Sequence, residues 1–426
     1  MRKTLTSAFR LSVLALALAL AGCGSLAPKY EVPTVDTPAA FKEGQGSWVR
    51  AAPADALARG PWWELFNDPV LNALAAQVEV TNQNVAAAAA AYAQARALTR
   101  EQRASLFPTV DLDASADRSG SRSGPARSSY QVGIGASWEP DVWGRLRLGV
   151  QGARAGEQAS EADLAAARLS AQGELATAYF GVRESDLLRI SLQETVRGNE
   201  RALEIARNRY NVGVVARTDV LQAETQLANA RAELLGVERQ RATFEHAMAV
   251  LLGKAPASFS LAADANWRPQ VPPVPLDVPS TLLQRRPDIA AAERRVQAAN
   301  AQIGIERAGY FPSIRLSGSA GSTAARIGDL FSASSLVWAL GASLAQTIFD
   351  AGATSARVDS ARAGLEEAAA RYRQTVLTAF QDVEDQLVAL RVLQQQQVLR
   401  QQAWEAAEQV EQQVLNRYRS GLVGFT

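Results

Sequence analysis

The sequence has only one cysteine, Cys23, and only one histidine, His246. A single cysteine excludes a disulfide framework within the chain and a zinc site built from several thiolates. A single histidine excludes catalysis by paired histidines and metal sites with several imidazole ligands. The sequence also lacks a phosphate-binding loop and a nucleophile-elbow motif. We therefore predict no metal site, no cofactor and no catalytic residue, and we do not expect an enzyme.

An excess of charge of one sign is also missing, because 44 Lys and Arg are matched by 43 Asp and Glu. This balance lacks the basic character of a nucleic-acid-binding protein, so no nucleic-acid partner is predicted. Beyond the N-terminus, no stretch reaches the roughly 18 consecutive apolar residues that indicate a membrane-spanning helix. A chain without such a helix can cross a membrane only as a β-barrel, in which every backbone polar group is paired.

The N-terminus has the pattern of a lipoprotein export signal. A basic start is followed by an apolar run, Leu11–Ala21, that is too short to span a bilayer as a helix. Small residues then lead directly into Cys23, as at a bacterial lipoprotein cleavage site. We predict that residues 1–22 are removed and that residues 23–69 form an acylated segment, anchored through lipid on Cys23. Gly24 in place of aspartate favours the outer membrane; an ordinary buried thiol is the alternative for Cys23.

The remainder of the chain contains an internal duplication. Three segments of the first half recur in the second half in the same order: Ala104–Leu112 as Ala308–Leu316, Ala136–Trp143 as Ala342–Phe349, and Asn208–Thr218 as Asn416–Thr426. Collinear matches of this kind indicate a duplicated unit. We place its copies at residues 70–254 and 282–426. A proline-rich linker, residues 255–281, separates them, because neither a helix nor a central strand persists through so many prolines.

Each copy has the same predicted order: a helix, two strands, a very long helix, a turn and a returning helix. The first helix is expected over about Val70–Leu106 and again over about Leu282–Tyr310, each ended by a Phe-Pro pair. Alternating apolar and polar residues over Tyr130–Trp138 predict a strand with one apolar face. Leu316–Thr323 and Trp338–Ile348 repeat this alternation more weakly.

The long helices are predicted over Arg145–Arg209 and Ala353–Arg417, which contain no proline. Each would be about 98 Å long at 1.5 Å per residue. Apolar residues recur at heptad spacing on the returning helix and on the second long helix: Val220, Leu227 and Leu234, and Val376, Phe380, Val383, Leu387 and Leu390. This spacing predicts a coiled-coil seam with a left-handed supercoil. An ordinary bundle core is the alternative.

Two pairs of strands are too few to close a membrane barrel, since known barrels have at least about eight strands. Open strand edges in lipid would leave backbone groups unpaired, at several kcal/mol each. Several copies must therefore share one barrel, closed by cyclic symmetry. Two, three or four copies would satisfy closure, and three would give a twelve-stranded barrel with an aqueous lumen.

Four motifs resemble those of the TolC-like outer-membrane efflux factors, and more closely their lipoprotein branch. The motifs are Pro61–Leu71, Glu139–Arg145, Leu282–Ile289 with the following Ala292-Glu293, and Ile348–Gly352. The resemblance extends from Cys23 to Thr426. It implies an α+β membrane protein: a homotrimer with a twelve-stranded β-barrel in the outer membrane, a mixed equatorial collar and a long α-helical barrel in the periplasm.

The same resemblance implies a function and partners. The chain would be the passive exit duct of a tripartite efflux pump for drugs or other small molecules. Its partners would be a periplasmic adaptor protein, an inner-membrane pump and outer-membrane lipid. Two alternatives stay open: the outer-membrane duct of a type I protein secretion system, and a lipid-anchored coiled-coil scaffold without a pore. The scaffold leaves the duplicated strand pairs unexplained.

The resemblance also assigns both turns between long helices to periplasmic tips, where the family closes its channel. The residues assigned to the tips are Arg209, Tyr210, Gly213, Thr218 and Asp219 in the first copy, and Arg417, Tyr418 and Gly421 in the second. Both glycines suit tight turns that need a positive φ. Plainer readings are open too: the tyrosines as seam residues, and Asp219 as an acid favoured at a helix N-terminus.

The second copy departs from the pattern at its end. It stops at Thr426, whereas the first copy continues to about Leu252. We expect the returning helix of the second copy to be missing from this sequence, together with the acid that often lines the closed aperture in the family.

Overall fold

The structure, a computed structural model, describes residues 25–35, 41–43, 61–120, 125–272 and 286–419. Cys23 and Gly421 lie outside these residues. The chain divides into two units: one comprises Met1–Asp36, Ala91–Ala162 and Asp288–Val376, the other Thr37–Ala90, Asp163–Pro287 and Leu377–Thr426. Four helices, α3, α4, α7 and α8, contribute residues to both units, α7 only through its first residue, Pro287.

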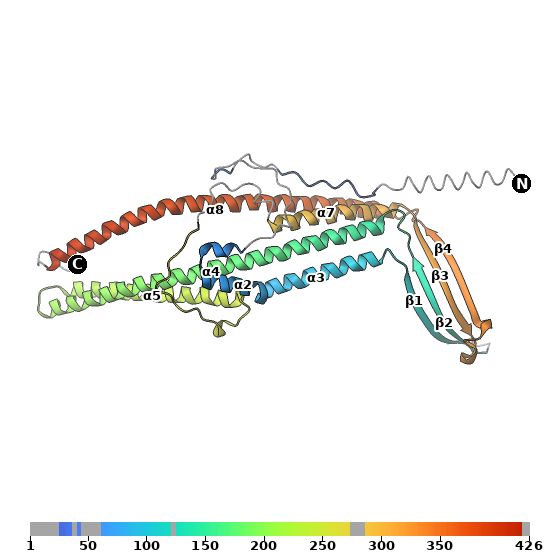
Figure 1. The fold of residues 1–426 in the computed structure, drawn as a ribbon, viewed down its shortest axis with the longest axis horizontal. Coiled ribbons are helices and arrows are strands. Elements are labelled where there is room, and N and C mark those ends of the chain that lie inside the picture. Colours follow the sequence, from blue (N-terminus) through green and yellow to red (C-terminus); the bar gives the residue numbers. More distant parts are fainter. Residues whose placement is uncertain (1–24, 36–40, 44–60, 121–124, 273–285, 420–426) are drawn as a thin grey trace. The chain divides into compact units, whose positions relative to one another are not determined.

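The first unit contains a four-stranded antiparallel sheet in the order β1-β2-β3-β4 (Figure 1). Its strands are β1 (Thr109–Ser119), β2 (Arg127–Trp138), β3 (Ser313–Ala324) and β4 (Leu336–Ala345). The central pair, β2 and β3, joins the two copies of the duplicated unit in one sheet. The predictions for β2 and β3 are confirmed. The prediction for β4 runs too far, because the chain turns after Ala345 toward the residues that cap the next helix.

A very long helix follows each pair of strands, as predicted. These helices are α4 (Arg145–Asn211) and α8 (Ala353–Arg419), each of 67 residues. Each is preceded by an aspartate that accepts hydrogen bonds from backbone N–H groups at the start of the helix. Asp141 accepts two such bonds, at 2.9 and 3.0 Å. Asp350 accepts one from Thr354 in the first turn of α8, at 2.8 Å, and one from Gly352, directly before the helix, at 3.0 Å. Among the described helices, none is both long and apolar enough to cross a membrane.

The single helix predicted over Val70–Leu106 is wrong, because the structure has two helices there, α2 (Pro69–Thr81) and α3 (Gln83–Ala104). Asn82 between them has an extended backbone, with ψ of 124°. Its side-chain oxygen accepts two backbone N–H groups at the start of α3, at 2.9 and 3.1 Å. Its amide nitrogen donates to the carbonyl of Leu251 at 2.9 Å. These three bonds favour a break over a continuous helix.

The corresponding helix of the second copy is α7 (Pro287–Arg307). A 3₁₀ turn, Ala308–Tyr310, completes the predicted helix before the Phe-Pro pair that ends it. Residues 282–285, predicted as its start, lie outside the described residues. The described part of the predicted linker has one short 3₁₀ turn, Pro256–Ser258.

The second unit includes the packed seam between α4 and α5 (Arg217–Leu251). The three residues of the predicted α5 stripe, Val220, Leu227 and Leu234, all lie in a hydrophobic cluster with α4. Two Arg–Glu ion pairs join the same helices, each with an N–O distance of 2.7 Å. The α5 stripe is therefore confirmed as part of a packed interface, while its coiled-coil geometry and the handedness of a supercoil stay predictions. In the α8 stripe, Val376 and Leu387 are buried and the other three residues are half-buried.

Candidate functional site

The sheet has one face that is apolar along all four strands. Strand pairing places Leu112, Ile134, Ala320 and Trp338 in one row from β1 to β4. Leu112 and Trp338 each expose 73% of their surface, and Leu340 in the adjacent row exposes 81%. The described chain therefore leaves this apolar face uncovered, although each such side chain would gain about 1.5–3 kcal/mol from burial.

The opposite face is polar, because side chains alternate between the two sides of a strand. Asp111 and Asp113 of β1 lie on this face. The row that begins at Asp111 continues through Gly135 and Ser319, and a further row pairs Gln131 with a threonine of β3. One face of the sheet is thus mainly apolar and the other polar, and such a sheet can separate a hydrocarbon phase from water.

The two outer strands of the sheet, β1 and β4, each pair on one side only within the described chain. Their free edges carry rows of backbone N–H and C=O groups. Such edges cost several kcal/mol per unpaired group in a hydrocarbon phase. A sheet of this kind is therefore stable in a membrane only if further strands pair with β1 and β4.

Three aromatic residues lie where the strands meet the helices. The Trp138 indole donates a hydrogen bond of 2.9 Å to the carbonyl of Leu106, and the Trp143 indole donates one of 2.7 Å to Pro312. The Trp143 ring stacks on Phe311 with a centroid distance of 4.8 Å. Tryptophan is enriched at membrane–water boundaries, because its ring is apolar and its N–H is polar.

Residues 25–35, which we call the strap, are held along α7 by three polar side chains spaced seven residues apart. These are Glu293, Asn300 and Arg307, of which the first two are buried. Glu293 accepts a bond from the Tyr30 hydroxyl, Asn300 donates at 2.9 Å to the Pro28 carbonyl, and Arg307 donates at 3.1 Å to the Leu26 carbonyl. Burial and the bond to Glu293 raise the pKa of the Tyr30 hydroxyl.

The first tip turn closes α4 with a Schellman motif. Gly213 has the predicted positive φ, at +77°. Its N–H donates to the Tyr210 carbonyl at 2.9 Å, and the N–H of Val214 donates to the Arg209 carbonyl at 2.9 Å. These two bonds pair carbonyls that the end of a helix would otherwise leave without partners.

Of the other predicted tip residues, the structure describes four and leaves one outside the described residues. Thr218 and Asp219 lie in the first turn of α5, the former exposed and the latter half-buried. Arg417 is exposed in the last turn of α8, and Tyr418 continues the helix. Gly421 lies outside the described residues. A role of either tip in closure stays a prediction.

In the second unit, Asp68 gathers four hydrogen-bond donors. One carboxylate oxygen caps α2, since it accepts from the backbone N–H groups of Val70 and Leu71 at 3.0 and 3.1 Å. The other accepts from the Tyr179 hydroxyl at 2.6 Å and the Trp267 indole at 3.1 Å. Burial raises the pKa of Asp68, but these bonds outweigh burial and hold the pKa below its usual value.

A second buried cluster fixes the start of the linker to α4 and α5. Arg241 donates to Asp186 and to the carbonyl of Leu261, both at 2.7 Å. Arg183 donates to the carbonyl of Ala262 at 2.8 Å. Asp68 belongs to the Pro61–Leu71 motif, so this motif anchors the start of α2 to α4 and to the linker. The structural roles of Asp68, Arg183 and Arg241 were not predicted from the sequence.

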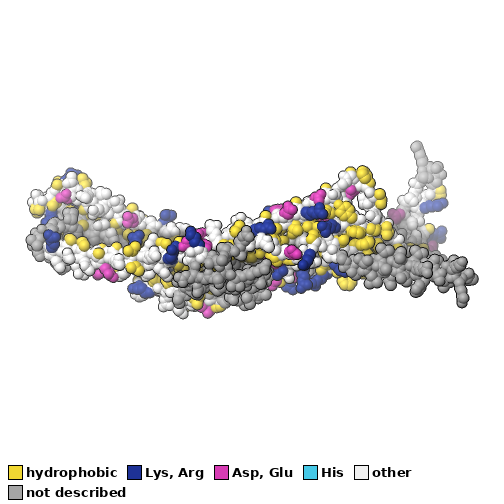
Figure 2. All heavy atoms as spheres, turned by 90° about the horizontal axis from the view of Figure 1, so that it is seen from above, with side chains coloured by type: hydrophobic (Ala, Val, Ile, Leu, Met, Phe, Trp, Pro, Cys, Tyr) yellow, Lys and Arg dark blue, Asp and Glu magenta, His cyan; other side chains and the backbone are white. Residues whose placement is uncertain are grey.

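Nothing in the described residues resembles a metal centre, since no group of three or more His, Cys, Asp or Glu side chains is placed to hold an ion. Side chains of both charge signs are interspersed over the face shown in Figure 2.

The sequence of this chain is similar to those of outer-membrane efflux proteins. The family model described as "Outer membrane efflux protein" matches residues 74–254 and 278–425. The chain is 33% identical over 423 residues to the "Probable efflux pump outer membrane protein TtgC" of Pseudomonas putida, covering 97% of this chain and 87% of the relative. It is 32% identical over 426 residues to the outer membrane protein OprJ of Pseudomonas aeruginosa, covering 97% and 88%.

The fold is also similar to a solved outer-membrane channel. The open state of the MtrE channel of Neisseria gonorrhoeae superposes with a TM-score of 0.83 at 30% sequence identity. The superposition covers 94% of this chain and 90% of the channel subunit. The helix-rich α+β architecture with its antiparallel sheet is thus shared with that structure.

Proposed function

Because this chain belongs to the outer membrane efflux protein family, we propose that it is the exit channel of a tripartite efflux pump. It conducts drugs or other small molecules passively from the periplasm to the outside. An inner-membrane pump supplies the energy, and a periplasmic adaptor links the pump to the helices of the channel.

The two-faced sheet is the observation that carries this proposal. Its apolar face, with Leu112, Trp338 and Leu340 exposed, suits contact with lipid tails. Its polar face, with Asp111 and Asp113, suits an aqueous lumen. The strands have 10 to 12 residues, and a tilted membrane strand needs about 9–11.

A homotrimer is the assembly that we propose. Three copies of the four-stranded sheet form a twelve-stranded barrel in which the edges of β1 and β4 pair with neighbouring subunits. The described part of α8 also leaves large apolar side chains uncovered, among them Leu399 and Trp404, which expose 64% and 59% of their surface. Contact with neighbouring helices would bury such residues.

The proposed organisation of the chain follows the sequence. Residues 1–22 are a signal peptide, and residues 23–69 begin with an acylated Cys23 that anchors the protein in the outer membrane. Residues 70–254 and 282–426 are the two efflux repeats, and residues 255–281 link them.

Closure is assigned to the tips. Thr218 and Asp219 of one subunit bond to a neighbouring coil near Tyr418, with Arg209, Tyr210 and Arg417 beside them and Gly213 and Gly421 forming the turns. Exposed contacts of this kind are worth about 0–1 kcal/mol each. A ring of them holds the channel closed until binding of the adaptor favours the open state.

Thiol labelling in planar bilayers tests the pore. Cys23 is the sole native cysteine and the proposed acylation site, so an added cysteine reports without background. Ser319→Cys and Ala320→Cys form a matched pair, because these neighbours on β3 lie on opposite faces of the sheet. A charged, membrane-impermeant thiol reagent should reduce the current of Ser319→Cys and leave that of Ala320→Cys unchanged. Absence of any conductance, or equal block of both variants, would contradict the proposed pore.

A further inference from the structure

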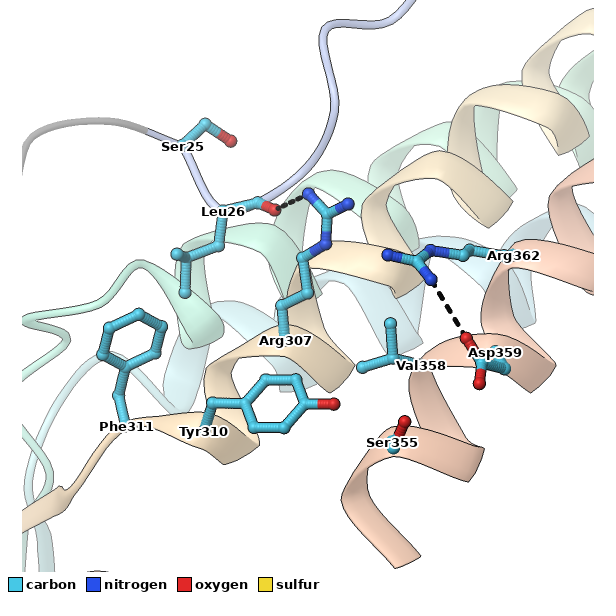
Figure 3. Close-up of a pocket in the computed structure, with 9 residues that line it drawn as sticks. All are labelled: Ser25, Leu26, Arg307, Tyr310, Phe311, Ser355, Val358, Asp359 and Arg362. Carbon is cyan, nitrogen blue, oxygen red and sulfur yellow. Dashed lines mark hydrogen bonds and ion pairs between the residues drawn. The ribbon is translucent and has the colours of Figure 1, made fainter. Parts of the chain in front are cut away.

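A cavity of about 380 Å³ lies in the first unit between the strap, the end of α7 and the start of α8 (Figure 3). Two arginines enter it from different helices, Arg307 from the last turn of α7 and Arg362 from α8. In Figure 3 the guanidinium group of Arg362 extends from α8 toward that of Arg307, which lies beside the carbonyl of Leu26. Val358 lies below them, and Ser355 adds a hydroxyl from the first turns of α8.

The charges in this cavity do not cancel. Arg362 forms an ion pair with Asp359 at 3.0 Å, whereas Arg307 donates to the neutral carbonyl of Leu26 at 3.1 Å. Two arginines against one aspartate leave an excess of one positive charge among the lining residues. Each bond engages a single Nη1 atom, so within the described chain the other N–H groups of both arginines are left for a ligand. Two facing cations repel each other, and an anion between them removes that repulsion.

The chemistry of the donors favours phosphate as this anion. A guanidinium presents parallel N–H groups that match two phosphate oxygens. The hydroxyl of Ser355 offers one more donor on the same wall. A phosphate between Arg307 and Arg362 would thus receive charge-assisted bonds from two sides.

The other wall of the cavity is apolar, which points to an amphipathic ligand. Leu26 and Phe311 line this wall beside the ring of Tyr310. Phe311 and Tyr310 expose 38% and 49% of their surface. Free phosphate would use only the charged half of the cavity, whereas a phospholipid would use both halves.

The place of the cavity in the fold agrees with a lipid, a step that rests on the proposed function. Phe311 lies two residues before β3 begins at Ser313. The carbonyl of Tyr310 accepts a bond of 3.1 Å from Gln346, directly after β4. Ser25 follows Cys23, the proposed lipid anchor, by two positions. If the sheet spans the membrane, the cavity lies at the level of the phospholipid headgroups.

We infer that this cavity binds a membrane phospholipid. Its phosphate lies between Arg307 and Arg362, and the start of its acyl chains lies along Leu26 and Phe311. The bound lipid ties the strap, which follows Cys23 closely in the sequence, to α7 and α8.

Three soluble probes separate the possible ligands in calorimetric titrations of lipid-depleted protein in detergent. They are dihexanoyl-phosphatidylglycerol below its micellar concentration, inorganic phosphate, and dioctanoylglycerol, which lacks the phosphate. The phospholipid should bind saturably and at least about tenfold more tightly than either other probe, because only it satisfies both walls. Equal binding of inorganic phosphate, or equal binding of dioctanoylglycerol, would overturn the assignment.

Two variants test the residues without removing a bond to the strap. Arg362→Gln should weaken binding of the phospholipid about tenfold to a hundredfold, since a charge-assisted bond is lost. Ser355→Glu should abolish it by repulsion, while an acid near the start of α8 favours the helix. Arg371→Gln is the matched control, because Arg371 pairs with Glu367 outside the cavity. Unchanged binding in both cavity variants would refute the site.

The conductance of the same wild-type preparation separates this inference from the proposed function. A preparation that conducts but does not bind the phospholipid would refute the lipid site alone. A preparation that binds the phospholipid but never conducts would refute the pore alone.

Discussion

The Tyr179 hydroxyl donates a hydrogen bond of 2.6 Å to the carboxylate of Asp68, and this contact joins α4 to the N-terminus of α2. Burial and the bond to Asp68 raise the pKa of Tyr179 to about 12, so the tyrosine stays protonated as a donor at neutral pH. Trp267 donates to the same oxygen at 3.1 Å from the linker. One carboxylate therefore connects three segments that are distant in the sequence.

The stability of the protein should depend on pH through Asp68. Its pKa is lower in the folded chain than in the unfolded chain. Its stabilising contribution is therefore fully present above the unfolded-state pKa of about 3.9, and it is lost as the pH falls through the folded-state pKa. Asp68→Asn should lower the free energy of unfolding by about 1–3 kcal/mol at pH 7. The difference from wild type should shrink below about pH 4.

Urea unfolding followed by circular dichroism at pH 7 and pH 3 measures this effect. Asp385→Asn is the control, because Asp385 is exposed on α8 and its contact with Gln381 is long, at 3.4 Å. A loss of stability in Asp68→Asn that is equal at both pH values would show that the charge of Asp68 is not what matters.

The two faces of the sheet should respond differently to a buried charge. Leu340 lies on the apolar face and Ala339, its neighbour on β4, lies on the polar face. A lysine on a lipid-facing position costs about 2–4 kcal/mol near the middle of the bilayer. Leu340→Lys should therefore reduce the amount of heat-modifiable trimer in outer-membrane fractions, whereas Ala339→Lys should assemble normally. Normal assembly of both variants would indicate that the apolar face does not contact lipid.

The alternation of side chains explains why the sheet could be predicted from the sequence. In β2 the apolar residues recur at every second position over Tyr130–Trp138, and β3 repeats this pattern more weakly; such alternation is enough to define one face of a strand. The long helices were predictable for a similar reason, since no proline interrupts Arg145–Arg209. The break at Asn82 was not predicted, because it depends on a bond to Leu251, which is distant in the sequence.

The strap was missed for the same physical reason. Glu293, Asn300 and Arg307 are polar residues at heptad spacing on α7, which is a signal that something polar covers that side of the helix. The covering segment itself is irregular and forms bonds mainly through backbone carbonyls, which every residue has. A further sign was Gly304, where a Cβ atom would approach the backbone nitrogen of Ala27 to 2.6 Å. Sequence alone could not connect these signals to residues 25–35.

A gate at the tips predicts a change in resting conductance. Asp219 is half-buried in the first turn of α5, beside the turn at Gly213. If it bonds to a neighbouring coil, Asp219→Ala should raise the single-channel conductance of the resting channel and shorten its closures. Glu238→Ala, at an exposed position further along α5, is the control.

The plainer role of Asp219 gives a different outcome in the same experiment. An acid in the first turn of a helix stabilises it by about 0.3–1 kcal/mol through the helix dipole. In that case Asp219→Ala would lower stability slightly, while conductance and closed lifetimes would not change. The two readings are thus separated by the current and not by the stability.

Two glycines of α4 should respond in opposite directions to the same substitution. A Cβ atom at Gly181 would lie 2.6 Å from the ring of Phe244 on α5, whereas one at Gly173 would meet nothing within 4 Å in the described chain. Alanine is favoured over glycine inside a helix by about 0.5–1 kcal/mol. Gly173→Ala should therefore stabilise the protein by about that amount.

At Gly181 the overlap with Phe244 costs about 1–3 kcal/mol and outweighs the gain. Gly181→Ala should be less stable than wild type, as measured by the urea midpoint, and the double variant Gly181→Ala with Phe244→Leu should recover part of the loss. Equal stabilisation by both single substitutions would mean that α4 and α5 are not packed this closely at Gly181.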